Sequence, residues 1–185
     1  MTLDDWKIIH SSVRDDWRTP RWLFERLDRE FRFTLDAAAS PHNALCHNYL
    51  MDPAGLVADW SRTPSGDPQA VFVNPPYGRG VGKWVEKAIQ EQAKGATVVM
   101  LMSSCTDTLW WRRAWDFANE IRLITGRVKF LNDKREEVKN GAPKGSAILV
   151  FRPYGGASYH GKRVPMCTLM AHPTHAERNR EVGNA

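Results

Sequence analysis

The segment 71–78, Val-Phe-Val-Asn-Pro-Pro-Tyr-Gly, constrains the fold of this chain more than any other. Its three apolar residues favour a buried strand. Proline has no N–H to donate to a sheet ladder, so this strand must end at Asn74. Pro76 also restricts Pro75 to an extended conformation and thereby fixes the direction of the Pro75 carbonyl. The segment predicts a rigid corner at the carboxyl end of a strand, where open α/β sheets bind their ligands.

The predicted corner offers hydrogen-bond acceptors. Pro75 and Pro76 lack an N–H, whereas the Asn74 side-chain oxygen and the Pro75 carbonyl can each accept a hydrogen bond. An exocyclic amino group on a nucleobase or an amide presents two donors, so two acceptors can hold both hydrogens and free the nitrogen lone pair. Tyr77 can stack on the ring that carries the amine. The pattern therefore predicts a site for alkylating an amino nitrogen, although a plain proline-rich turn would share these residues.

The segment 74–77 resembles the catalytic tetrad of S-adenosylmethionine-dependent amino-methyltransferases. Over residues 17–152, the wider pattern resembles the small phage-type DNA adenine-N6 methyltransferases. The resemblance implies a three-layer α/β domain of the Rossmann-like methyltransferase type, with a mostly parallel sheet and a C-terminal antiparallel hairpin. The segment 40–66 is short for the further strands of a full methyltransferase sheet, so the number of strands could be reduced. It also implies methyl transfer from S-adenosyl-L-methionine to adenine N6 in duplex DNA, with the target adenine flipped out of the stack. The implied catalytic residues are Asn74, Pro75, Pro76 and Tyr77.

Length and charge are consistent with one compact enzyme. The 185 residues suit a single α/β domain, which we place at 17–153 between an N-terminal extension, 1–16, and a loosely ordered tail, 154–185. A net charge of +5 suits a polyanionic partner. No apolar run reaches membrane-spanning length, and residue 1 is not followed by a signal-peptide core.

The cysteines indicate a reducing compartment. Cys46, Cys105 and Cys167 form no Cys-x-x-Cys pair, which is typical of reduced thiols and predicts a cytoplasmic protein, in the bacterial host if the chain is phage-encoded. His42 and His47 flank Cys46 loosely, but no fourth ligand has suitable spacing, so no metal site is predicted.

Two segments before the corner are candidates for holding the cofactor. Thr19 can cap a helix that begins at Pro20, and the apolar spacing predicts its buried face as Leu23, Phe24, Leu27 and Phe31. By the resemblance, Thr19 and Pro20 lie beside the methionine end of the cofactor.

Residues 31–39 predict the first core strand and its turn. Asp36 ends the strand, and Ala37 begins a run of small residues that would let the backbone approach a ligand. The Asp36 carboxylate would attract the cationic amino group of S-adenosylmethionine, or it could simply cap the following turn. Asp59 precedes Trp60 in a pair that the family pattern also contains. Asp59 would accept a hydrogen bond from the adenine or ribose of the cofactor, or it is a plain loop residue.

The second half of the chain predicts alternating helices and strands. The spacing of its apolar residues predicts an amphipathic helix with the buried face Val81, Trp84, Val85, Ala88 and Ile89. Residues 96–102 predict a parallel strand, and Thr106 or Asp107 would cap a helix over 108–118. Strands over 121–130 and 147–151 complete the antiparallel hairpin. The inner face of the 108–118 helix is predicted to comprise Trp111, Ala114, Trp115 and Ala118.

Basic side chains indicate where nucleic acid would bind, and Trp110 lies beside Arg112 and Arg113 on the 108–118 helix. By the resemblance, residues 126–130 border the target-base pocket. Solvated side chains are the alternative at every basic position. The candidates for nucleic-acid binding are Arg79, Lys83, Arg112, Arg113, Lys134 and Arg135.

Other substrates carry the same planar amine. Cytosine N4, an RNA base or a protein glutamine would suit the corner, and a nucleic-acid-binding module without catalysis is a further alternative. The basic balance and the family pattern favour DNA. A chain this short has no obvious separate target-recognition unit, so relaxed sequence specificity is predicted.

Overall fold

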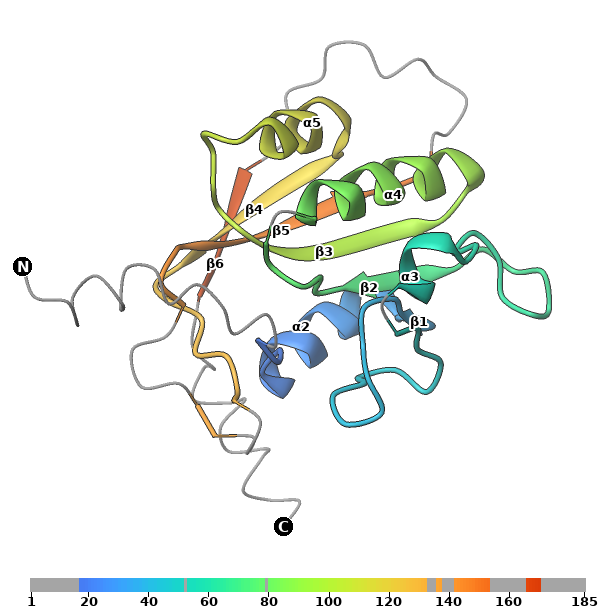
Figure 1. Cartoon of the computed structure of the whole chain (residues 1–185), viewed down its shortest axis with the longest axis horizontal. Helices are drawn as coiled ribbons and strands as arrows, with labels where there is room; N and C mark the ends of the chain where they lie inside the picture. Colours follow the sequence, from blue (N-terminus) through green and yellow to red (C-terminus); the bar gives the residue numbers. More distant parts are fainter. Residues whose placement is uncertain are drawn as a thin grey trace, which may run out of the picture.

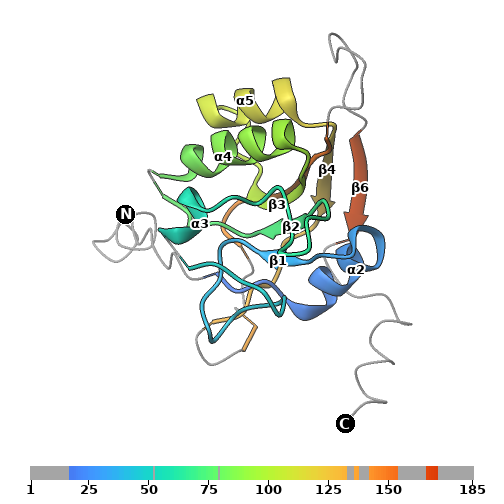
Figure 2. The ribbon, with the colours of Figure 1, turned by 90° about the vertical axis from the view of Figure 1, so that its right-hand side faces the viewer.

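The structure is a computed structural model that describes residues 17–51, 53–78, 80–132, 136–137, 142–153 and 166–170. Within these residues, helices cover both faces of a six-stranded sheet (Figure 1). Figure 2 shows α3, α4 and α5 on one face and α2 on the other, which confirms the three-layer α/β prediction. The elements are α2 (Arg21–Phe31), β1 (Leu35–Asp36), α3 (Ala54–Val57), β2 (Ala70–Val73), α4 (Val81–Lys94), β3 (Thr97–Ser103), α5 (Leu109–Phe117), β4 (Glu120–Thr125), β5 (Ser146–Phe151) and β6 (Met166–Met170).

The strand order is β1-β2-β3-β5-β4-β6. β1, β2 and β3 are parallel neighbours, and β5 lies antiparallel between β3 and β4. The predicted antiparallel pair is therefore present, but β4 ends at Thr125, so the prediction of a strand through residue 130 is wrong. β6 adds a parallel edge strand beside β4. This strand falls in the segment 154–185 that was predicted as a tail. Its five-residue apolar pattern is hard to recognise in the sequence because Gly, His and Arg residues surround it. The domain boundaries stay predictions.

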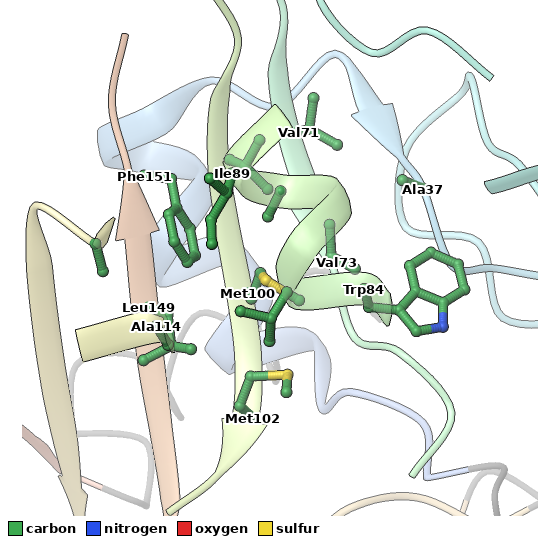
Figure 3. Packing of buried hydrophobic residues seen from close by; sticks show 14 of the residues in the cluster. Ala37, Val71, Val73, Trp84, Ile89, Met100, Met102, Ala114, Leu149 and Phe151 are labelled. Carbon is green, nitrogen blue, oxygen red and sulfur yellow. The ribbon is translucent and has the colours of Figure 1, made fainter. Parts of the chain in front are cut away.

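Two apolar clusters hold the three layers together. On one face, α4 and α5 pack on the sheet through side chains that include Trp84, Ile89 and Ala114 (Figure 3). On the other face, the buried residues of α2 are Trp22 and the predicted Leu23, Phe24, Leu27 and Phe31. All six residues of β5 are buried, as expected of a central strand covered by helices on both sides.

Two predicted elements begin later than the sequence indicates. Phe31 is the last residue of α2, and Arg32 follows in the left-handed region with φ 55°. The Arg32 N–H donates to the Asp28 carbonyl and the Phe33 N–H to the Asp28 carboxylate, so this helix end occupies the start of the predicted strand. The first strand is only Leu35–Asp36. In α5 the cap is Thr108, whose hydroxyl accepts the Trp111 N–H at 3.3 Å, and the predicted caps Thr106 and Asp107 are wrong.

The buried face of α5 is rotated from its predicted position. Trp111 and Ala114 are buried, but Trp115 is 45% exposed, so its assignment to the inner face is wrong. Trp110 was expected to project away from the core, yet it is partly buried there and meets the Trp111 ring edge-on at a centroid distance of 5.9 Å. Successive residues of a helix are rotated by about 100° around its axis. The buried face of α5 is shifted toward Trp110, and Trp115 therefore lies at the border between the buried and exposed faces. Among the described helices, none is both long enough and apolar enough to cross a membrane.

Candidate active site

The proline corner lies at the carboxyl edge of the sheet, as predicted. β2 ends at Val73, and residues 74–77 continue without regular structure before α4 begins at Val81. Val73 pairs with Met100 of β3, so the end of β3 lies beside the corner. In Figure 1 the starts of α4 and α5 lie at the same edge of the sheet. The corner is therefore surrounded by loops from several segments.

The Asn74 side chain is held by residues that precede α2. Its Nδ2 donates to the Trp17 carbonyl at 2.6 Å and to the Thr19 hydroxyl at 3.1 Å. Thr19 was predicted to cap α2, but the N-cap of this helix is Pro20 and receives no side-chain hydrogen bond. The prediction is wrong because the Thr19 hydroxyl bonds to Asn74 instead.

Tyr77 is anchored through its hydroxyl. The hydroxyl oxygen lies 3.3 Å from Asn74 Oδ1 and 3.2 Å from the Leu101 carbonyl, and either oxygen can accept its proton. Burial raises the pKa of Tyr77 above its usual range, with the nearby Cys105 as a second cause. The phenol therefore stays neutral at physiological pH.

A cavity of about 260 Å³ opens beside the corner. We call it the corner pocket. Its walls come from three segments of the chain: residues 17–19 before α2, the end of β1 with the turn and loop that follow it, and the end of β2 with the corner itself. The lining residues are Trp17, Arg18, Thr19, Asp36, Ala38, Ala39, Ser40, Asn43, Leu45, Phe72, Asn74 and Pro76. The structure thus brings together the predicted residues Thr19, Asp36, Asn74 and Pro76.

Asp36 is the buried carboxylate of the corner pocket. It is 3% exposed and accepts hydrogen bonds from the Leu45 N–H at 3.1 Å and the Ala38 N–H at 3.5 Å. Burial raises its pKa to about 6, against the opposite effect of these two backbone bonds. The structure supports the interpretation in which Asp36 orders its turn, and the side chain also lines the pocket; its contact with a cofactor stays a prediction. A cationic group in the pocket would favour its ionised form.

The loop after this turn supplies pocket residues that the sequence analysis missed. Ser40, Asn43 and Leu45 all line the corner pocket. The Asn43 side-chain oxygen accepts from the Ser40 N–H at 2.5 Å and from the Ser40 hydroxyl at 3.0 Å. A Ser-Pro-x-Asn sequence is typical of such a turn, so the turn itself was predictable. Its position against the end of β2 was not.

Two residues that were predicted to bind the cofactor, Ala37 and Pro20, do not line the corner pocket, but they form backbone hydrogen bonds next to residues that do. Ala37 is fully buried, and its N–H donates to the Phe72 carbonyl at 2.9 Å. The Pro20 carbonyl accepts the first N–H groups of α2, from Leu23 and Phe24.

Asp59 is not among the pocket residues. It is exposed, accepts hydrogen bonds from the Ser61 N–H and hydroxyl at 2.7 and 2.6 Å, and lies 3.6 Å from Lys94 Nζ. These Ser61 bonds are the main reason that its pKa falls to about 2. Lys94 ends α4, and a 14-residue helix spans about 20 Å, so Asp59 lies far from the corner at which α4 begins. The structure therefore supports the loop-residue interpretation of Asp59.

The predicted nucleic-acid residues differ in their surroundings. Lys83 is exposed in the first turn of α4, close to the corner in sequence. Arg112 donates to Asp116 at 3.1 Å, and Arg113 donates to Glu86 at 2.7 Å and covers the Phe117 ring at 4.4 Å. Both arginines are therefore already beside carboxylates. Arg79, Lys134 and Arg135 lie outside the described residues.

Comparisons with known proteins identify a family and a similar fold. A DNA N-6-adenine-methyltransferase of Escherichia phage T1 is 29% identical over 157 residues, covering 76% of this chain and 64% of that relative. A Listeria monocytogenes protein described as a class I S-adenosylmethionine-dependent methyltransferase has a similar fold. Its TM-score is 0.50 at 11% identity, over 96% of this chain and 73% of that one. The model of the DNA N-6-adenine-methyltransferase (Dam) family matches residues 8–177. This chain therefore belongs to the DNA N-6-adenine-methyltransferase (Dam) family.

Proposed function

We propose that this chain transfers a methyl group from S-adenosyl-L-methionine to the N6 amine of adenine in DNA. The observation that carries the proposal is the fixed Asn74 amide beside a pocket with a buried carboxylate. The family and the phage T1 relative support adenine in DNA as the substrate. Cytosine N4, RNA and protein glutamine remain the alternative acceptors.

The residues of the corner pocket fit this cofactor. Asp36 presents a buried carboxylate to a cationic amino group, and the pocket extends from this side chain to Asn74 and Pro76. When bound, S-adenosylmethionine supplies an electrophilic methyl on its sulfonium, and the carbon–sulfur bond breaks as the carbon–nitrogen bond forms. A methyl donor bound in this pocket would have its positive charge within reach of the acceptor corner.

The corner would orient the acceptor amine. Asn74 Oδ1 and the Pro75 carbonyl accept its two hydrogens, which directs the nitrogen lone pair toward the methyl. Tyr77 stacks on the flipped base while its hydroxyl stays anchored to Asn74 or Leu101. The amine attacks as a neutral group, and the methylated nitrogen releases its proton to solvent. Well-oriented intramolecular reactions reach effective molarities of roughly 10⁵–10⁸ M, so orientation can supply much of the rate.

The test of this function is methyl transfer from radiolabelled S-adenosylmethionine. Wild type and Asn74→Ala are incubated with duplex DNA, RNA or bulk protein, and the modified base is identified after digestion. We expect N6-methyladenine in DNA from wild type, and at least about 100-fold less from Asn74→Ala, because the amine loses a fixed acceptor. Gln90→Ala, which changes an exposed residue of α4, serves as the matched control and should keep wild-type activity.

Each other outcome assigns a different function. Label on cytosine N4, RNA or protein would keep the chemistry and replace the substrate. No label from folded wild type would leave the non-catalytic binding module as the function.

Cofactor affinity should depend on the protonation of Asp36. Since the pKa of this carboxyl is about 6, the cation-binding form is lost as the pH falls below 6. At pH 5 roughly one-tenth of Asp36 would be ionised, so the Kd for S-adenosylmethionine should rise about tenfold. Titration calorimetry between pH 5 and 8 measures this, with Asp36→Asn expected to bind weakly and without the pH dependence. Asp59→Asn should retain the wild-type profile.

The same pH change should not unfold the protein through Asp36. A carboxyl pKa raised in the folded state makes the folded state bind more protons, so this group increases the free energy of unfolding as the pH falls from about 6 to 4. A thermal melt in the same buffers separates loss of binding from loss of fold.

We propose that Lys83 contacts a DNA phosphate near the target base, together with Arg79, Lys134 and Arg135. Lys83 is exposed beside the corner and forms no ion pair within the described part of the chain. A phosphate approaching Arg112 or Arg113 would also meet Asp116 or Glu86. These two arginines are therefore expected to contribute less to DNA binding than the sequence suggests.

The salt dependence of DNA binding tests this assignment. The slope of log K against log salt is negative, and each lost phosphate contact decreases its magnitude by about 0.9 for duplex DNA. Lys83→Ala is expected to show this decrease for every DNA sequence, whereas Arg112→Ala should keep the wild-type slope. Equal decreases in the two variants would contradict the distinction.

A further inference from the structure

The orientation of the Asn74 amide is determined by a group that can only accept a hydrogen bond. The two ends of an asparagine amide have nearly the same shape but opposite hydrogen-bonding character. The Trp17 carbonyl lies 2.6 Å from Asn74 Nδ2. A reversed amide would bring two acceptor oxygens to that distance with no proton between them. The nitrogen therefore faces Trp17, and Oδ1 faces the other side, toward Tyr77.

The Trp17 carbonyl is itself held in place. The Trp17 ring packs edge-on against Phe130 at a centroid distance of 5.4 Å. The next residue, Arg18, exchanges both backbone hydrogen bonds with Leu131, at 3.2 and 2.9 Å. This short antiparallel bridge joins the segment before α2 to the segment after β4. Trp17 therefore cannot easily turn its carbonyl away from Asn74.

Thr19 completes the contact from a buried position. It is 7% exposed, and its hydroxyl oxygen accepts from Asn74 Nδ2 at 3.1 Å. Because Thr19 also lines the corner pocket, one side chain touches both the cofactor site and the acceptor corner. Together, Trp17 and Thr19 supply two acceptors for the Asn74 amide nitrogen.

The Tyr77 hydroxyl acts on the opposite end of this amide. It has one proton and two acceptors at similar distances, Asn74 Oδ1 at 3.3 Å and the Leu101 carbonyl at 3.2 Å. When it donates to Leu101, both lone pairs of Asn74 Oδ1 are available to an entering amine. A rotation of one O–H bond thus frees the acceptor without moving the ring.

We propose that the Trp17 carbonyl and the Thr19 hydroxyl are positioning groups that hold Asn74 Oδ1 toward the target amine. They also make position 74 selective for an amide over a carboxylate, because an ionised carboxylate would place an oxygen against the Trp17 carbonyl. This inference rests on the proposed amine methylation and assigns Thr19 a role in the methyl-transfer step beyond its contact with the cofactor pocket.

The first test compares Thr19→Val, which removes the hydroxyl, with Thr19→Ser, which retains it. Loss of one hydrogen bond that orients the reacting amide should lower kcat about five- to tenfold in Thr19→Val. The KM for S-adenosylmethionine should change much less, and Thr19→Ser should keep kcat within about twofold of wild type. A Thr19→Val enzyme with wild-type kcat, or with an effect confined to KM, would overturn the positioning role.

The second test uses Asn74→Asp and the pH dependence of its kcat at saturating cofactor. An aspartate here must be protonated to donate to Trp17, so the ratio of variant to wild-type kcat should rise up to about tenfold for each unit by which the pH is lowered. A ratio that does not change with pH would overturn the proposed amide selectivity. Thermal melts of every variant distinguish these effects from unfolding. If wild type transfers no methyl group to any substrate, the proposed function fails as well.

Discussion

Gly55→Ala is expected to lower kcat/KM for methyl transfer by about 100-fold, since displacing a reacting geometry by about 1 Å can have this effect. A Cβ atom on Gly55 would lie 2.1 Å from the Ala37 carbonyl oxygen and 2.7 Å from the Trp84 ring. Figure 3 shows Ala37 beside this ring. Ala37 is bonded to β2 through its N–H, and Trp84 is buried and stacked on Trp60 at 6.2 Å. Neither neighbour can move freely.

The displaced turn belongs to the cofactor site. Asp36 precedes Ala37 and Ala38 follows it, and both line the corner pocket. Calorimetric titration with S-adenosylmethionine should show the loss of affinity, while overpacking should reduce the free energy of unfolding by about 1–3 kcal/mol. Gly80→Ala is the matched control, because its Cβ would meet no atom within 4 Å at φ −89°. If Gly55→Ala binds S-adenosylmethionine and melts like the wild type, this result would contradict the close approach of Gly55 to Ala37 and Trp84.

Glu91→Ala is expected to reduce the free energy of unfolding by about 3–5 kcal/mol, a large part of the 5–15 kcal/mol typical of a folded protein. Glu91 is fully buried, and its carboxylate accepts from Lys87 Nζ at 2.6 Å, Lys94 Nζ at 2.8 Å and the Trp60 N–H at 2.8 Å. Lys87 is also buried and lies 5.3 Å from the Trp60 ring centre. Removing the Glu91 carboxylate leaves the buried Lys87 ammonium and the buried Trp60 backbone N–H without their partner.

Urea denaturation followed by far-ultraviolet circular dichroism measures this loss. Lys94→Ala is the control, because Lys94 is 46% exposed and its ion pair with Glu91 is expected to contribute less than about 1 kcal/mol. Replacing both buried partners, as in Glu91→Leu with Lys87→Met, should recover part of the stability, since neither charge is then left unpaired. A larger effect from Lys94→Ala than from Glu91→Ala would contradict this account.

Local chemistry explains which elements were predictable. The end of β2 follows from two residues that cannot donate to a sheet ladder, and the structure places that end at Val73. The buried faces of α2 and α4 follow from the helical spacing of their apolar residues. Arg32 and Trp115 show the limit of such patterns. The helix end at Asp28 and the packing of Trp110, not Trp115, against the core depend on contacts that spacing alone does not specify.

The sequence by itself determined the acceptor corner, because the properties of asparagine and proline act within a few residues. It also determined the general architecture and the carboxylate at the end of β1. Only the tertiary structure decided which groups meet. Thr19 bonds to Asn74 across 55 residues, while Asp59 lies beside Lys94 instead of the pocket. Such pairings depend on where the sheet brings distant segments together, and neither residue type nor local spacing encodes that position.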